Sequence, residues 1–282
     1  ARAGSRVVIL EEGPAVRNGQ FTPNFWETTK LLLRDLSSTF AVGQSFMPIL
    51  QGCCVGGTTT INSAICWRLP EDVWRAWKKI FGHGSPLTDE RLNNAFQKLE
   101  RELHIRPTQP EVLGRNSQFM ERACRNLGIP SQSIKRNEKG CEGSSLCLSG
   151  CPTGRKLSME NSYIPEAITH GARLYPLCRA ESLAIERGRA AGVIGRFLEP
   201  RGRQPGAALT VRARKGVILA AGVIHSPLLL LKHGISTRHA GRHFMCHPGV
   251  SVAARFPNDV RMWEGATPVS YTHLRAHETV LD

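Results

Sequence analysis

The sequence has no long hydrophobic run, few aromatic residues, and fewer acidic than basic side chains. No apolar run approaches the roughly 20 residues that span a bilayer, which argues against a membrane-spanning helix. Lys and Arg number 37 against 23 Asp and Glu, a formal net charge of +14, so an acidic partner such as nucleic acid has to be considered. Aromatic residues make up only 6% of the chain and do not alternate with the basic residues, as a base-stacking surface would require. We therefore expect no nucleic-acid binding.

The chain also lacks an internal repeat and a disulfide scaffold. Nine cysteines in 282 residues are too sparse for such a scaffold, and an odd number leaves at least one thiol outside any bridge. With 41% hydrophobic residues the chain can form a sizeable core, as one large domain or two ordinary ones. It begins at Ala1 without Met or a signal-like segment, so a leader peptide is not visible and the localisation stays open.

The hydrophobic pattern predicts an α/β protein. The β-branched run 6–10, which ends at acidic residues, is typical of a buried parallel strand. Apolar residues at helical spacing predict helices over 89–103 and 119–127. Short alternating runs then predict an antiparallel meander, and an apolar strand over 215–222 leads into a helix with Pro227 in its first turn. The three meander runs are 182–186, 192–199 and 209–214.

Two short segments carry residues suited to binding a ligand. Glu11 ends the first predicted strand, where dinucleotide-binding folds place an acid that accepts hydrogen bonds from the adenosine ribose. The glycine-rich turn of such a fold would precede Ala1. The second segment is Gly56–Asn62, whose glycines let the backbone approach a ligand and whose side chains offer donors. A carboxylate that caps a strand and a turn before a Thr-capped helix are the ordinary alternatives.

The second segment, Gly56-Gly57-Thr58-Thr59-x-x-Asn62, resembles the flavin loop Gly-Gly-Ser-Ser-x-x-Asn of the glucose-methanol-choline oxidoreductases, with threonines in place of the serines. Other segments resemble the same family in the same order. Residues 7–13 resemble the family's second strand. Residues 171–183 resemble its adenine-contacting strand, with Ala180 where valine is usual. Residues 222–235 resemble its second signature, and residues 241–247 resemble the segment after it.

The resemblance implies FAD as the cofactor and an α/β fold: an incomplete Rossmann-like FAD-binding domain, a parallel sheet plus the meander, with an inserted, partly helical substrate or cap region. Arg68 stands where the family often carries an arginine near the active-site side of the flavin. The implied domains are 1–66 and 171–263 for the two parts of the FAD-binding domain, 67–170 for the helical and Cys-rich insertion, and 264–282 for a tail unlike the family. The implied cofactor-binding residues are Glu11, Gly56, Gly57, Thr58, Thr59, Asn62, Ala180 and Gly222.

The implied reaction is oxidation of a CH–OH group in an alcohol, sugar or sterol-like substrate, with a hydride passing to flavin N5 and a proton to a histidine base. That histidine lies in the family's C-terminal part, and we do not identify it here, because His225, His243 and His247 fall in flavin-domain segments. We therefore expect an inactive fragment. The tail looks like translated sequencing-adapter sequence, so His273 and His277 have no expected role.

Cys141, Cys147 and Cys151 lie in a Gly/Ser-rich stretch and resemble a subgroup in which Cys-x5-Cys-x3-Cys precedes Pro-x-Gly. This spacing resembles that of bacterial flavin glucose dehydrogenases, which implies a three-iron iron–sulfur cluster and an electron-acceptor protein such as a cytochrome. Inert or disulfide-linked thiols, or a zinc site with a fourth ligand from elsewhere, are the alternatives. For the whole chain, the alternatives are a non-catalytic metal-binding or basic interaction protein and a fragment whose exposed strand edges prevent folding.

Overall fold

The structure, a computed structural model, contains two compact units. It describes residues 1–43, 46–82, 84–200, 203–235, 238–245, 254–261 and 263–266, and the backbone of 270–272. The first unit is formed by residues 1–15, 53–55 and 167–256, and the second unit by residues 16–52, 56–166 and 257–282. Each unit is therefore assembled from segments that are far apart in the sequence. The predicted domain boundaries do not follow these segments and remain a prediction.

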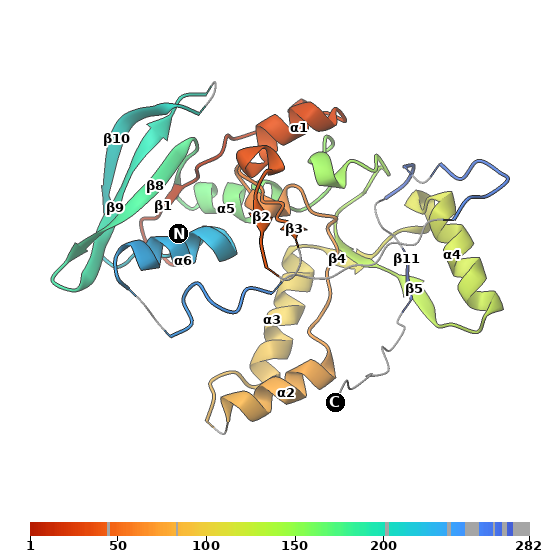
Figure 1. Ribbon diagram of the computed structural model, residues 1–282. Helices are drawn as coiled ribbons and strands as arrows, with labels where there is room; N and C mark the ends of the chain where they lie inside the picture. Colours follow the sequence, from red (N-terminus) through yellow and green to blue (C-terminus); the bar gives the residue numbers. More distant parts are fainter. Residues whose placement is uncertain are drawn as a thin grey trace. The chain divides into compact units, whose positions relative to one another are not determined.

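The first unit has the predicted α/β character. Strand β1 (Val8–Leu10) pairs in parallel with β7 (Arg173–Tyr175), and three antiparallel strands follow in the spatial order β10-β9-β8 (Figure 1). The meander is thus confirmed, and its strands are β8 (Cys178–Glu186), β9 (Arg189–Leu198) and β10 (Pro205–Arg212).

The turn after β1 is packed against a distant part of the chain. The backbone N–H of Val55 donates to the carbonyl oxygen of Pro14 at 2.9 Å, which brings residues 53–55 beside this turn. A Cβ atom at Gly13 would lie 2.0 Å from the carbonyl oxygen of Cys53, far inside van der Waals contact. Only glycine fits here, which explains why a glycine follows the acidic pair at the end of the strand.

Helix α6 (Gly222–Lys232) corrects two expectations. The helix begins at Gly222, so Pro227 lies inside it rather than in its first turn. The strand predicted over 215–222 is wrong, because the structure describes no strand there and Ile218 is 92% exposed. A strand satisfies its backbone groups by pairing with a neighbour, and no described strand pairs with this segment.

The C-terminal end of α6 is held against β8 by two side chains. The ammonium of Lys232 donates to the carbonyl of Glu181 at 2.9 Å, and the backbone N–H of Leu183 donates to Nε2 of His233 at 2.8 Å. Figure 1 shows the helix beside the meander. Strand β8 therefore packs against α6, and it also follows directly on from the β1–β7 pair.

The second unit is mainly helical. The helix predicted over 89–103 is confirmed as α3, where the hydroxyl of Thr88 accepts from the backbone N–H of Arg91 at 3.2 Å and caps the first turn. The helix predicted over 119–127 is confirmed as α4. No described helix is both long and apolar enough to cross a bilayer. The helix bounds are α1 (Phe25–Leu32), α2 (Glu71–Phe81), α3 (Asp89–Glu102), α4 (Arg115–Asn126) and α5 (Tyr163–Thr169), the last of which runs across the boundary of the units.

The strands of the second unit are short antiparallel pairs. They are β2 (Phe40–Ala41) with β3 (Met47–Pro48), β4 (Ile105–Pro107) with β6 (Lys135–Asn137), and β5 (Ser131–Ser133) with β11 (Ser270–Thr272). The tail predicted over 264–282 is described only at 264–266 and in the backbone of β11, and His273 and His277 lie outside the described residues.

The interior of the second unit contains many polar side chains. Apolar residues such as Leu32 and Trp74 are buried there, but two cations and a carboxylate are buried with them. The buried polar residues of this unit are Thr28, Thr29, Thr60, Thr108, Ser117, Arg136, Asn137, Glu138, Lys156 and Ser158. Buried polar groups need hydrogen-bond partners, so the loops that carry these residues constrain one another.

Replacing Gly13 by alanine should destabilise the first unit by about 2 kcal/mol or more, because the new Cβ atom cannot avoid the Cys53 carbonyl without a backbone shift. Chemical denaturation followed by circular dichroism measures the change. Gly216→Ala is the matched control, since a Cβ atom at Gly216 would meet nothing within 4 Å. Equal stability of the two variants would contradict the close approach.

Candidate functional site

Residues Gly56–Asn62, here called the glycine loop, form a tight turn that needs glycine at its start. Gly56 has a φ of +95°, and a 3₁₀ turn spans Gly57–Thr59. A Cβ atom at Gly56 would lie 2.3 Å from Oε2 of Glu160 and 2.5 Å from Oγ1 of Thr60. Both the backbone angle and the lack of space therefore exclude a larger residue.

The predicted ligand-binding hydroxyls of the glycine loop have different roles. Oγ1 of Thr59 donates to the carbonyl of Gly56 at 2.6 Å and accepts from the backbone N–H of Met159 at 3.0 Å. Its hydroxyl therefore holds the loop together. Thr58 is exposed, and its Oγ1 accepts from the backbone N–H of Gly52 at 3.1 Å, which leaves its own proton for a ligand.

Asn62 closes the glycine loop and has a donor to spare. Its side-chain oxygen accepts from the backbone N–H of Ala64 at 3.0 Å, and the residue is exposed. The oxygen bond fixes the amide, so the NH₂ group is directed away from Ala64 and can donate to a ligand. Thr58 and Asn62 are thus the two side chains of the loop best suited to contact a cofactor.

A segment that the sequence did not single out, residues 156–160, holds the glycine loop in place. The ammonium of Lys156 donates to the carbonyl oxygens of Thr60 at 2.7 Å and of Asn62 at 2.9 Å. Oε2 of Glu160 accepts from the hydroxyl of Thr60 at 2.9 Å. These contacts join parts of the chain nearly 100 residues apart, so local sequence patterns give no sign of them.

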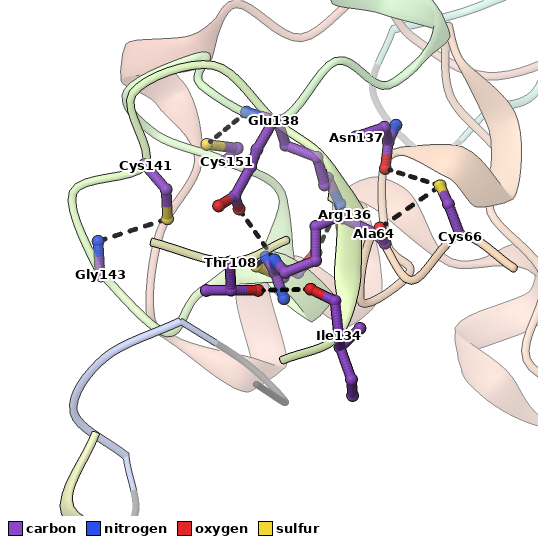
Figure 2. Close-up of polar contacts among 12 residues, drawn as sticks. Ala64, Cys66, Thr108, Ile134, Arg136, Asn137, Glu138, Cys141, Gly143 and Cys151 are labelled. Atoms are coloured by element: carbon purple, nitrogen blue, oxygen red, sulfur yellow. Dashed lines mark hydrogen bonds and ion pairs between the residues drawn. The ribbon is translucent and has the colours of Figure 1, made fainter. Parts of the chain in front are cut away.

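A buried ion pair lies next to this segment. Nε of Arg136 and Oε2 of Glu138 are 2.8 Å apart, with the two side chains 1% and 8% exposed, and Figure 2 marks this contact with a dashed line. Nη2 of Arg136 also donates to Sγ of Cys147 at 3.1 Å. Burial lowers the pKa of Arg136, but Cys147 and Glu138 outweigh this and raise it above its usual value.

The expected metal site in residues Cys141–Cys151, here called the cysteine loop, is not supported. Each thiol has a partner of its own. Cys141 accepts from the backbone N–H of Gly143 at 3.4 Å (Figure 2). Cys147 accepts from Arg136, and Cys151 accepts from the backbone N–H of Lys156 at 3.4 Å. In the part of the chain that the structure describes, no three His, Cys, Asp or Glu side chains are arranged to hold a metal ion.

Electrostatics give the physical reason. The Arg136 guanidinium lies directly beside the sulfur of Cys147. Its positive charge would repel a metal cation bound to that sulfur. Burial raises the pKa of the Cys141 thiol to about 11, which disfavours the thiolate that binds metals. None of the eight described cysteines forms a disulfide.

In the first unit, Glu11 lies at the carboxyl end of β1. Its Oε1 accepts from the backbone N–H of Gly13 at 2.8 Å, and its carbonyl accepts from the backbone N–H of Cys178, the first residue of β8, at 2.8 Å. Ala180 follows on β8 opposite Gly195, and Gly222 is the first residue of α6. Ala180 thus lies on β8, and Glu11 and Gly222 lie at the ends of two elements that contact β8.

Arg68 and the three histidines of the flavin-domain segments are the remaining residues that the sequence analysis considered. Arg68 is bound by Glu100 of α3 through two contacts, 2.8 Å from Nε to Oε1 and 2.5 Å from Nη2 to Oε2. Its guanidinium is therefore already neutralised. His225 lies in the first turn of α6 and His243 in an exposed segment without regular secondary structure, while His247 lies outside the described residues.

Comparison with known proteins identifies the family. A sequence model described as GMC oxidoreductase matches residues 29–249, well over half of the chain. The chain belongs to the GMC oxidoreductase family.

Relatives of this GMC chain are longer proteins. It is 33% identical over 275 residues to an uncharacterised GMC-type oxidoreductase of Mycobacterium tuberculosis, covering 97% of the chain and 42% of that protein. It is 24% identical over 269 residues to a long-chain-alcohol oxidase of Arabidopsis thaliana, covering 92% of the chain and 35% of that protein. An FAD-dependent oxidoreductase from Chaetomium thermophilum has the same fold, with a TM-score of 0.54, 16% identity, and coverage of 80% of this chain and 42% of that one. The chain therefore spans less than half of these proteins.

The residues of this GMC chain fit an FAD cofactor. A carboxylate at the carboxyl end of a parallel strand, as at Glu11, is suited to ribose hydroxyls. An exposed hydroxyl and an oriented amide, at Thr58 and Asn62, supply donors on a loop whose glycines permit close approach. The chemistry of both units agrees with the family.

Replacing Arg136 by methionine should destabilise the second unit by about 3–5 kcal/mol, because the buried Glu138 carboxylate would lose its counter-ion. The double variant Arg136→Met with Glu138→Met should recover much of this loss, since neither charge then remains buried. Urea denaturation of the wild-type protein and the two variants measures their free energies of unfolding.

The control for these two variants is Arg155→Met, which removes an arginine from an exposed ion pair. Arg155 pairs with Glu142 at 3.0 Å, but both side chains are about half exposed, so its loss should cost less than about 1 kcal/mol. If Arg136→Met behaved like Arg155→Met, the buried pair would not contribute as described.

Proposed function

We propose that this chain is the FAD-binding part of an oxidoreductase that oxidises the CH–OH group of an alcohol, sugar or sterol-like substrate. The observation that carries the proposal is the glycine loop, in which Gly56 adopts a left-handed conformation and the exposed Thr58 and Asn62 offer donors. Membership of the GMC oxidoreductase family supports it. The name of the Arabidopsis relative, a long-chain-alcohol oxidase, supports an alcohol as the substrate class.

The three predicted residues of the first unit each have a role in this proposal. Glu11 would accept hydrogen bonds from the ribose hydroxyls of FAD, and the backbone of Ala180 would contact the adenine, which a change from valine to alanine does not disturb. Gly222 would let the start of α6 approach the cofactor closely. Bound FAD would supply the chemistry by accepting a hydride from the carbon that bears the hydroxyl group.

The electron acceptor in this proposal is oxygen. The three thiols of the cysteine loop accept separate hydrogen bonds, and no described group of His, Cys, Asp or Glu is arranged to hold a metal ion, so the proposal does not include a three-iron cluster or a cytochrome partner. We further propose that the histidine base is supplied by residues outside these 282, in the portion of the relatives that the chain does not match.

The full-length protein that contains this chain should show a flavin absorption spectrum that bleaches anaerobically with one class of sugar, sterol or fatty alcohol. In air, hydrogen peroxide should form in amounts equal to the alcohol oxidised. Residues 1–282 alone should show no turnover. The absence of bound flavin in the full-length protein would refute the proposal at its centre, and iron with acid-labile sulfide would reinstate the cluster.

Replacing Glu11 by glutamine should weaken FAD binding by about ten-fold, because hydrogen bonds to a charged acceptor are worth about 1.5–3 kcal/mol. Isothermal titration of the apoprotein with FAD measures this. Glu12→Gln is the matched control, since Glu12 forms an ion pair with Arg179 at 2.9 Å instead. An equal effect at both positions would argue that charge near β1, and not a bond from Glu11, governs binding.

A further inference from the structure

Lys156 is a buried cation with all of its donors in use. The side chain is 2% exposed, and its ammonium donates to the carbonyl oxygens of Thr60 at 2.7 Å, Asn62 at 2.9 Å and Cys147 at 2.7 Å. An ammonium has three N–H donors and no acceptor. The three bonds therefore satisfy it completely, which is what a buried charge requires.

The three acceptors come from two different loops. Thr60 and Asn62 lie on either side of the buried Ile61 in the glycine loop, whereas Cys147 belongs to the cysteine loop. One small group thus fixes the direction of two carbonyls in the glycine loop and ties them to the cysteine loop. A flexible lysine in an exposed position could not do this, because it would lose side-chain entropy for bonds that water supplies equally well.

The residues after Lys156 add contacts to the same loop. The backbone N–H of Met159 donates to Oγ1 of Thr59 at 3.0 Å. The carboxylate of Glu160 accepts from the hydroxyls of Thr60 at 2.9 Å and of Ser158 at 2.6 Å. Residues 156–160 therefore fix the positions of Thr59, Thr60 and Asn62. The two side-chain donors left for a cofactor, on Thr58 and Asn62, belong to this same fixed stretch of backbone.

We propose that Lys156 is a positioning residue for FAD, which sets the conformation of the glycine loop and makes the cysteine loop its brace. The inference rests on the proposed function, because it assumes that the glycine loop binds the flavin cofactor. It gives the cysteine loop a role without a metal: the carbonyl of Cys147, and not its thiol, is the functional contact.

The first test compares Lys156→Met with Lys139→Met in the full-length protein. Methionine is unbranched and only one atom shorter than lysine, but it leaves three carbonyls without a donor, whereas Lys139 is exposed and its loss removes the same charge. Lys156→Met should bind FAD about ten-fold more weakly or worse. It should also change the visible circular dichroism of the flavin that remains bound, which a general loss of stability would not do. Lys139→Met should leave both unchanged.

FAD affinity within about two-fold of the wild type and an unchanged flavin spectrum in Lys156→Met would overturn the inference. A wild-type protein that binds no FAD would instead refute the proposed function, so the two failures are distinct.

A second measurement needs no variant and therefore holds even if Lys156→Met does not fold. Hydrogen exchange of the wild-type protein, with and without FAD, should show that amides of residues 57–62 and 147–157 gain protection together. Protection of the glycine loop alone would leave the proposed function standing and overturn the brace.

Discussion

The buried charges of the second unit constrain most of its loops. Arg136 and Lys156 are 1% and 2% exposed, and an ion removed from water costs several kcal/mol unless hydrogen bonds replace its hydration. Burial lowers the pKa of Lys156, while Cys147 and Glu160 favour its charged form. Its partners therefore have to be fixed acceptors, and backbone carbonyls from the glycine and cysteine loops supply them. If either loop moved, the buried Lys156 ammonium would lose hydrogen bonds that replace its hydration.

The same constraint explains the cysteine loop. The spacing of its thiols is what an iron–sulfur ligand set would need, but spacing along the chain does not decide what surrounds each sulfur. Here the sulfur of Cys147 lies against the Arg136 guanidinium, and the sulfur of Cys151 accepts from the backbone of Lys156. The Cys147 thiol thus helps to satisfy the buried Arg136 cation, and the Cys151 thiol satisfies the backbone N–H of the residue that carries the other cation. A loop rich in glycine and serine is suited to this task, because it can bend to present several acceptors at once.

Sequence patterns predicted those parts of the fold that depend on local periodicity. The strand β1, the helices α3 and α4 and the meander follow from apolar spacing and from caps such as Thr88. The prediction of a strand over 215–222 was wrong because an apolar run indicates only that a segment could be buried. Whether the segment forms a strand depends on a neighbouring strand with which it can pair. The glycine loop was found because its residues are contiguous. Lys156 and Glu160 were missed because a single lysine in a chain with 37 Lys and Arg residues has no pattern of its own.

The departures of this chain from the usual family pattern keep the atoms that the proposal needs. A threonine in place of serine retains the hydroxyl, and at Thr59 that hydroxyl donates to the Gly56 carbonyl and accepts from Met159, bonds that either residue could form. The extra methyl group also reduces the rotamer freedom of the side chain, which favours a loop with one conformation. At Ala180 the proposed contact is made by the backbone, which β8 and β9 hold by their ladder whatever the side chain. Substitutions that change side-chain size but preserve hydroxyls and backbone geometry are therefore compatible with the same cofactor chemistry.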